Sequence, residues 1–200
     1  MSNPSLILAS SSTSRRVMLE AAGIAFSVVA PGVDEDAIKD RLSAEGADGA
    51  TIAHTLAEAK AFAVSQTHRH ALVLGADQIL MCRERIFSKA RDEKEARDTL
   101  RALRGQSHEL ISAAIIAKDG VALWRRADIA RLAMREFSES FLQEYLTAEM
   151  PDILGSVGCY RIEGRGAQLF REVKGDHFCI RGLPLIGVLE ALRDLGAVSV

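Results

Sequence analysis

Hydroxyl and basic side chains are concentrated in one short segment, Ser10 to Arg16. The segment follows an apolar run and precedes a predicted helix. Free backbone N–H groups at a helix N-terminus attract phosphate, serine hydroxyls add donors, and the guanidinium of Arg15 can make paired contacts to phosphate oxygens. Ordinary helix capping beside solvated arginines explains the same residues equally well. The segment is not a P-loop, because it lacks the GxxxxGK[ST] pattern.

Asp77 is the candidate acidic group. It follows a continuous apolar run at residues 71–76, which predicts a buried strand. A carboxylate at the end of such a strand is expected at the ligand edge of an α/β sheet, where it can bind a metal ion or accept a proton from water. The alternative interpretation is a turn residue that closes the strand, and the sequence leaves both open.

Other charged residues are candidates only in combination. Each of them alone is typical of a solvent-exposed charge, and Asp92 has a specific alternative role, since Glu95 follows it at capping-box spacing. They are Asp34, Glu35, Lys60, Lys89 and Asp92.

A glycine-rich segment follows later, at residues 155–166. Gly164 and Gly166 would let a ligand approach the backbone closely, although a tight turn explains them as well. The pattern is not a dinucleotide-binding fingerprint, because Leu169 stands where the third glycine is needed and a strand is predicted to follow.

The periodicity of apolar residues predicts the elements that must position these groups. We expect strands at 6–8, 26–30, 71–76, 108–117 and 121–128, a third strand of that sheet near 129–137, and another at 168–173. Helices are expected at 14–22, 51–66, 92–103, 138–149 and 184–196. This order predicts an α/β fold with a mixed sheet flanked by helices, and its ligand should lie at the strand ends.

Composition excludes several classes of protein. A formal net charge of -2 and an aromatic content of 5% disfavour binding to a nucleic acid polymer. No apolar run is long enough to span a membrane, and the N-terminal segment lacks the basic region of a signal peptide. The odd number of cysteines, without CxxC spacing, predicts free thiols. We therefore expect a cytoplasmic protein without membrane contact.

Taken together, the segments resemble the Maf family of nucleotide pyrophosphatases along nearly the whole chain. No single block is decisive, but their order and spacing are. The main blocks are LILASSSTSRR at 6–16, PGVDE at 31–35, LAEAKA at 56–61, LGADQIL at 74–80, SKARD at 88–92, GCYRIEGRGAQLF at 158–170 and GLPL at 182–185.

The resemblance implies one Maf/ITPase-like domain over residues 1–200, with two lobes around a central cleft, often as a homodimer. It implies hydrolysis of a nucleoside triphosphate between the α and β phosphates, with Mg²⁺ or Mn²⁺ as cofactor. Asp77 and Glu35 correspond to the catalytic and metal-binding acids. The residues that match the phosphate-binding set are Ser10, Arg15, Lys60 and Lys89.

Three positions that tune base recognition in the family are Ser14, Gln78 and Glu163 here. Gln78 and Glu163 resemble the branch that acts on 7-methyl-GTP, since a glutamate can accept hydrogen bonds from guanine and suits a cationic base. The chain differs from that branch at Ser14, where a tryptophan is typical. We expect better turnover of 7-methyl-GTP than of UTP. The alternative function is a non-catalytic nucleotide-binding regulator of septum formation in cell division.

Overall fold

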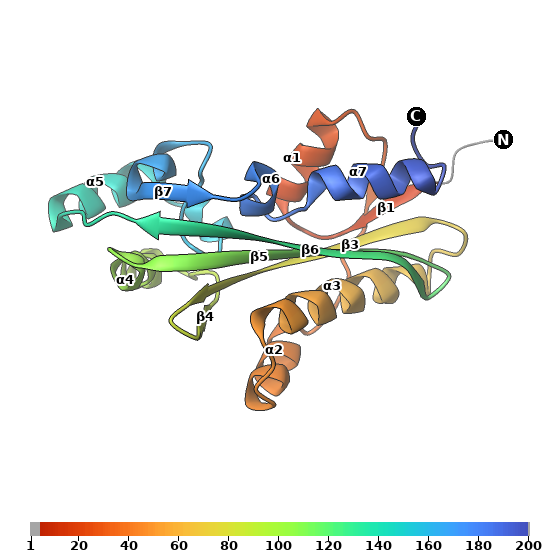
Figure 1. Ribbon diagram of the computed structural model, residues 1–200, viewed down its shortest axis with the longest axis horizontal. Coiled ribbons are helices and arrows are strands. Elements are labelled where there is room, and N and C mark those ends of the chain that lie inside the picture. Colours follow the sequence, from red (N-terminus) through yellow and green to blue (C-terminus); the bar gives the residue numbers. More distant parts are fainter. Residues whose placement is uncertain (1–4, 200) are drawn as a thin grey trace.

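The computed structural model describes residues 5–199. Residues 1–4, on which part of the signal-peptide expectation depends, and residue 200 lie outside that range. A mixed sheet of seven strands forms the centre, with helices on both faces (Figure 1). The strands are β1 (Leu6–Ala9), β2 (Ser27–Val28), β3 (Leu72–Cys82), β4 (Arg85–Phe87), β5 (Ser107–Lys118), β6 (Val121–Met134) and β7 (Phe170–Lys174).

The helices are mostly capped by the side chain that precedes them. Ser12, Asp34, Asp48, Asp92, Ser138 and Asp176 each accept a hydrogen bond from a backbone N–H in the first turn of the following helix. The helices are α1 (Thr13–Ala21), α2 (Glu35–Ala44), α3 (Gly49–Ser65), α4 (Glu93–Leu103), α5 (Glu139–Glu149), α6 (His177–Ile180) and α7 (Leu185–Asp194), with 3-10 turns at Asp152–Gly155 and Arg165–Leu169.

Strand β3 carries the feature that creates the site. The sheet order is β2-β1-β3-β5-β6-β7, and β4 also pairs with β3. One edge of β3 pairs with β5 along residues 73–81. The opposite edge pairs with β1 at residues 72–75 and with β4 at residues 80–82. Among residues 5–199, therefore, no strand pairs with residues 76–79 on that edge, and this interval is called the β3 gap below.

The expectation that Asp77 ends a strand is wrong. Strand β3 continues without interruption to Cys82, so Asp77 lies in its middle, inside the β3 gap. The apolar run breaks at Asp77 because the neighbouring strand β1 ends at Ala9, which is paired with Gly75. The polar side chains thus mark the end of the partner strand, not the end of β3.

Alternation along β3 sends Asp77 and Gln78 to opposite faces of the sheet. Helix α3 covers the face of Asp77, while α1, α6 and α7 cover the face of Gln78 (Figure 1). Helix α3 packs very closely at Gly75, where an added Cβ would lie 2.3 Å from the carbonyl oxygen of Ala57. Because only glycine permits this approach, Gly75 sets how near α3 comes to Asp77.

The hydrophobic core is divided along the length of the sheet. One cluster joins α4, α5 and the far ends of β3, β5 and β6, with Leu100, Leu110 and Leu146 at its centre. Separate clusters pack α1 and α7, and α3, on the two faces of the other end. The cleft described below lies between these two regions and takes lining residues from both.

Most of the predicted elements are confirmed, two expected strands need correction, and β4, α2 and α6 were not predicted. The third strand near 129–137 is wrong, because β6 continues the second arm of the hairpin to Met134. Helix α2, which begins at Glu35, was not predicted. The strand expected at 168–173 begins only at Phe170, since a 3-10 turn precedes it.

None of the helices within residues 5–199 has the length and apolar character needed to cross a lipid bilayer. The cysteines in this range, Cys82, Cys159 and Cys179, are buried free thiols, as expected.

Candidate active site

A buried lysine links two carboxylates at the β3 gap. Lys60 Nζ lies 2.6 Å from Asp77 Oδ1 and 2.8 Å from Glu35 Oε1. The side chains of Lys60 and Asp77 are almost completely buried, whereas that of Glu35 is 39% exposed. This cluster has two negative charges and one positive charge, so its net charge is negative and favours the binding of another cation.

Glu35 owes its place to the local structure at the start of α2. Asp34 caps that helix by accepting a hydrogen bond from the N–H of Ala37, so Glu35 becomes its first residue. Burial acts to raise the pKa of Glu35, but the hydrogen bond and charge of Lys60 outweigh it and hold that pKa below its usual value. Glu35 is therefore ionised at neutral pH and can bind a cation.

Arg15 supplies positive charge from the opposite face. Its Nε donates to the carbonyl of Gly182 at 2.8 Å, and a terminal nitrogen donates to Ser10 Oγ at 3.1 Å. Burial lowers the pKa of Arg15, while the charges of Asp77 and Glu35 act in the opposite direction. Since Arg15 is buried and held by two fixed acceptors, it is preorganised for an anion.

Lys89 completes the set of predicted cations. It lies just after β4 and lines the same cleft, where the residue is exposed but its amino group is partly buried by the surrounding side chains. Burial and then the charge of Arg15 lower the pKa of Lys89, against the opposing effect of Glu35. A ligand with several negative charges would relieve this repulsion, so Lys89 and Arg15 together favour a polyphosphate.

Gln78 is oriented by the protein itself. Its Nε2 donates to Ser112 Oγ at 3.0 Å, to the carbonyl of Cys179 at 3.0 Å and to that of Ile180 at 3.1 Å. Carbonyls accept only, so the amide nitrogen must face them and Oε1 must face the cleft. Gln78 therefore offers a ligand an acceptor and no donor.

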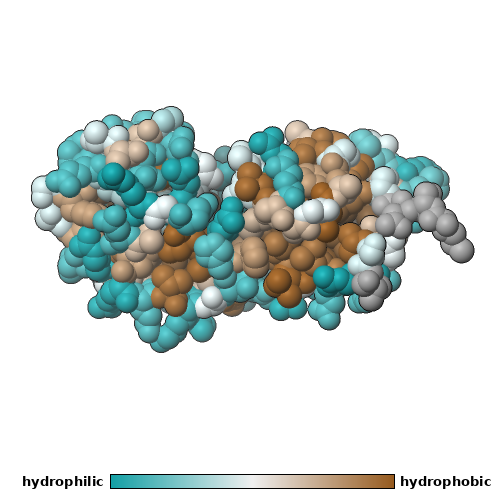
Figure 2. All heavy atoms as spheres, turned by 90° about the horizontal axis from the view of Figure 1, so that it is seen from above, coloured by the Kyte–Doolittle hydropathy of each residue, from teal (hydrophilic) through white to brown (hydrophobic). Residues whose placement is uncertain are grey.

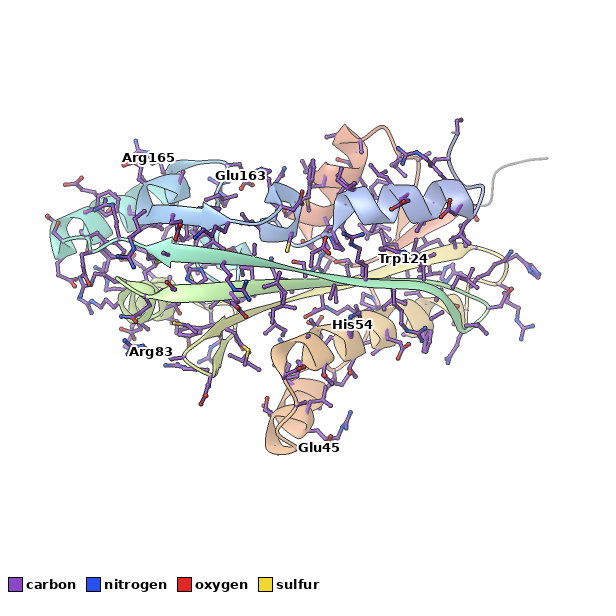
Figure 3. The ribbon with its side chains drawn as sticks, viewed as in Figure 1. Glu45, His54, Arg83, Trp124, Glu163 and Arg165 are labelled. Carbon is purple, nitrogen blue, oxygen red and sulfur yellow. The ribbon has the colours of Figure 1, made fainter. Side chains whose placement is uncertain are left out.

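Ser14 and Glu163 meet the same short segment, residues 179–182. Ser14 Oγ donates to the carbonyl of Arg181 at 2.9 Å. Glu163 Oε1 lies 3.5 Å from Arg181 Nε, and Figure 3 shows Glu163 beside α6. We call Ser14, Gln78, Glu163 and residues 179–182 the base end of the cleft.

The predicted site residues converge on one cleft of about 1620 Å³. The acids and Lys60 lie at the β3 gap, Arg15 and Ser10 lie beside it, and Gly182 stands next to both Arg15 and Gln78. Asp34 also lines the cleft, whereas Asp92, which caps α4, and the glycines Gly164 and Gly166 do not. All the positions assigned by the family resemblance line it: Ser10, Ser14, Arg15, Glu35, Lys60, Asp77, Gln78, Lys89 and Glu163.

Sequence reasoning missed two contributors. Ser112 holds Gln78 from the facing position on β5, and its only signal was a single hydroxyl within the apolar run 110–117. Arg181 was not considered, although a cation directly before the GLPL block is visible in the sequence.

A buried aromatic contact supports the glycine-rich wall of the cleft. His108 Nε2 lies 2.7 Å from the hydroxyl of Tyr160, which lines the cleft, and His108 Nδ1 has no hydrogen-bond partner within residues 5–199. Burial lowers the pKa of His108 from 6.5 to about 4. His108 therefore stays neutral when the protein is folded at physiological pH.

This burial predicts a defined acid sensitivity. The unfolded chain binds a proton at His108 as pH falls below 6.5, but the folded protein does so only near pH 4. The free energy of unfolding should fall across that interval, by roughly 3 kcal/mol from this residue. His108→Gln should lose less stability than the native protein between pH 7 and pH 4.5 in urea titrations.

The control for that experiment is His54→Gln, because His54 lies on α3 and is only partly buried (Figure 3). It should keep the native acid response. If His108→Gln also kept it, burial of a neutral His108 would not be the cause.

The donor set fits a divalent cation. Glu35 Oε2 and Asp77 Oδ2 make no hydrogen bond within residues 5–199, and Mg²⁺ is commonly bound by one or two carboxylates plus substrate phosphates. No group of three or more His, Cys, Asp or Glu side chains in the described range forms a complete metal cage. The arrangement therefore suits a cation that is bound partly by these two carboxylates and partly by the phosphate oxygens of a substrate.

The fold and the cleft define a class: an α/β protein in which buried carboxylates face a set of cations across a gap in the sheet. Comparison with known proteins makes this specific. Residues 5–195 match the family model Maf, described as Maf-like protein. The chain belongs to the Maf family.

Full-length relatives agree with this assignment. The chain is 47% identical over 200 residues, covering 100% of both chains, to a protein of Caulobacter vibrioides named nucleoside triphosphate pyrophosphatase. A protein of Granulibacter bethesdensis with the same name is 46% identical over 195 residues, 98% of this chain and 99% of its own. A protein of Rhizobium meliloti named 7-methyl-GTP pyrophosphatase is 42% identical over 196 residues, 98% of each chain.

Proposed function

We propose that the protein is a nucleoside triphosphate pyrophosphatase, which releases a nucleoside monophosphate and pyrophosphate. The observation that carries this proposal is the Glu35–Lys60–Asp77 cluster opposite Arg15 in one cleft. The names of the full-length relatives support the same activity. No comparable observation favours a non-catalytic regulator.

The residues suggest a direct hydrolytic step. Asp77 Oδ1 is held by Lys60, which leaves Oδ2 to accept a proton from water. The water oxygen forms a bond to the α phosphorus, and the bond from that phosphorus to the α–β bridging oxygen breaks. Pyrophosphate leaves with the bonding electrons.

Positive side chains stabilise the leaving group and hold the phosphates in line. Arg15 is fixed by Gly182 and Ser10, and Lys60 and Lys89 face the same cleft. Positioning and charge neutralisation of this kind provide most of the catalysis in phosphoryl chemistry.

A divalent cation, Mg²⁺ or Mn²⁺, would be held by Glu35 and Asp77, and it would supply further charge neutralisation at the phosphates. Glu35 Oε2, which makes no hydrogen bond within residues 5–199, supports this part of the proposal, and Asp77 Oδ2 has a second lone pair besides the one that accepts the proton.

A panel of nucleotides tests the proposal. Purified protein with MgCl₂ should release pyrophosphate, and kcat/KM should be higher for 7-methyl-GTP than for UTP. Gln78 Oε1 and the Glu163 carboxylate both accept hydrogen bonds, and guanine offers them two N–H donors where uracil offers one. A preference for UTP or dTTP would refute the guanine assignment, and no turnover of any nucleotide would refute the activity.

We further propose that the chain forms one cytoplasmic domain that acts as a homodimer. Within the described part of the chain, residues 121–130 of β6 have β5 as their sole strand partner, so their other edge is not paired with a strand. Apolar side chains gather on the half that carries α1 and α7 (Figure 2). The large exposed ones there and on β6 are Val17, Val121, Leu123, Ile129 and Ile186.

A further inference from the structure

We propose that Arg181 is a specificity-determining residue, which neutralises Glu163 and so lowers the preference of the cleft for a positively charged base. The inference rests on the proposed function and refines it. Guanine methylated at N7 carries a positive charge, whereas unmethylated guanine is neutral. The charge at the base end therefore decides between them.

The contact between Arg181 and Glu163 is the first observation. Arg181 Nε and Glu163 Oε1 are 3.5 Å apart, and both side chains line the cleft. The Arg181 side chain is only 19% exposed, while Glu163 is 41% exposed. The position of the Arg181 side chain is therefore restricted by the residues that bury it. Glu163 reaches it from the glycine-rich segment 155–166.

The position of the Arg181 backbone is also fixed. Its carbonyl accepts from Ser14 Oγ at 2.9 Å. The two preceding carbonyls, of Cys179 and Ile180, accept from Gln78. The three base positions predicted from the sequence thus meet on one segment, and Arg181 is the charged member of it.

An unsatisfied donor points to a ligand. Arg181 Nε is buried and makes no hydrogen bond to any group within residues 5–199. Its contact with Glu163 brings the charges together without satisfying this N–H. The part of the guanidinium that is exposed to the cleft can donate to a base carbonyl, so Arg181 suits a neutral base with an exocyclic oxygen.

Other charged side chains near the base end have partners of their own, although Arg161 also interacts electrostatically with Glu163. Arg161 pairs with Glu149 at 3.2 Å and with Asp152 at 3.1 Å, and Arg15 is directed to Gly182 and Ser10. The Glu163–Arg181 pair has no net charge. Glu163 alone would attract a cationic base, and Arg181 removes most of that attraction.

Substitutions that change the net charge of the Glu163–Arg181 pair by one unit test the proposal. At about pH 6.5, where the methylated base is cationic, we would measure kcat/KM for 7-methyl-GTP and for GTP and take their ratio. The triphosphate is the same in both substrates, so contacts to it cancel. Arg181→Gln leaves one negative charge, Glu163→Gln leaves one positive charge, and the double variant is neutral again.

The ratio should rise about fivefold in Arg181→Gln, which corresponds to about 1 kcal/mol. It should fall about fivefold in Glu163→Gln and return to within about twofold of the native value in the double variant. Arg91→Gln is the matched control, because Arg91 lines the cleft but pairs with Glu95, and its ratio should not change. Thermal unfolding checks that each variant is folded.

Equal ratios in the native protein and Arg181→Gln would overturn the proposal, as would a double variant that resembles either single one. If the variants did not fold, the native protein would still decide, because a neutral base end predicts a ratio that is insensitive to salt between about 0.05 M and 0.5 M NaCl. A steep fall with salt would contradict it. Absence of pyrophosphate release from every nucleotide would instead refute the proposed function.

Discussion

Asp77→Asn is expected to lower the rate of pyrophosphate release by about 1000-fold, because the variant can no longer accept a proton from water. Asparagine has the same shape, and its Oδ1 can still accept the hydrogen bond from Lys60 that Asp77 accepts at 2.6 Å. The protein should therefore stay folded. The measurement is single-turnover release of pyrophosphate from GTP, with circular dichroism to confirm the fold.

Asp36→Asn is the control for this prediction. Asp36 lines the same cleft from α2, and its exposed carboxylate pairs with Lys39 at 3.9 Å. The Asp36 variant should keep nearly native activity. Native activity in Asp77→Asn would remove Asp77 from the mechanism.

Lys60→Met is expected to have a large effect on stability as well as on activity. It removes the only ion-pair partner of Asp77 in the described part of the chain and leaves that buried carboxylate uncompensated. Breaking a buried pair by removing one partner costs about 3–5 kcal/mol. Urea titration should show a loss of free energy of unfolding in that range.

The same cluster predicts two partial rescues of Lys60→Met. Millimolar Mg²⁺ should restore part of the lost stability, since the two carboxylates then have a cation between them. The double variant with Asp77→Asn should be less destabilised than Lys60→Met alone, because no unpaired charge remains. Lys94→Met, at the exposed surface of α4 and paired only with Asp98 in the described part of the chain, should show neither effect. A Lys60 variant as stable as the native protein would contradict the assigned role.

Most of the fold could be predicted from the sequence because its main strands are continuous apolar runs, which can be recognised without knowledge of tertiary contacts. The runs at 71–76 and 108–117 were found without any tertiary information. The β3 gap could not be found in this way, since it depends on where β1 ends at Ala9 and where β4 begins at Arg85. Asp77 was therefore identified correctly as the polar residue that follows an apolar run. It was predicted at the end of the strand, however, and it lies in the middle of β3.

Charged site residues were harder to distinguish from surface charges. Lys60 lies on an alanine-rich helix, and its burial follows from the close packing of α3 at Gly75, a contact between segments distant in the sequence. The resemblance to a family supplied the missing link between Lys60, Asp77 and Glu35, and the structure brings the three together. Neither approach indicated Arg181, whose partner Glu163 lies on another segment.

Product analysis tests the central claim most directly. Native protein incubated with GTP and MgCl₂ should yield GMP and pyrophosphate in equal amounts, because the proposed attack of water activated by Asp77 is on the α phosphorus. Release of GDP and orthophosphate would show cleavage at the wrong bond. Tight binding of GTP with no product after long incubation would contradict the account and favour a nucleotide-binding regulator.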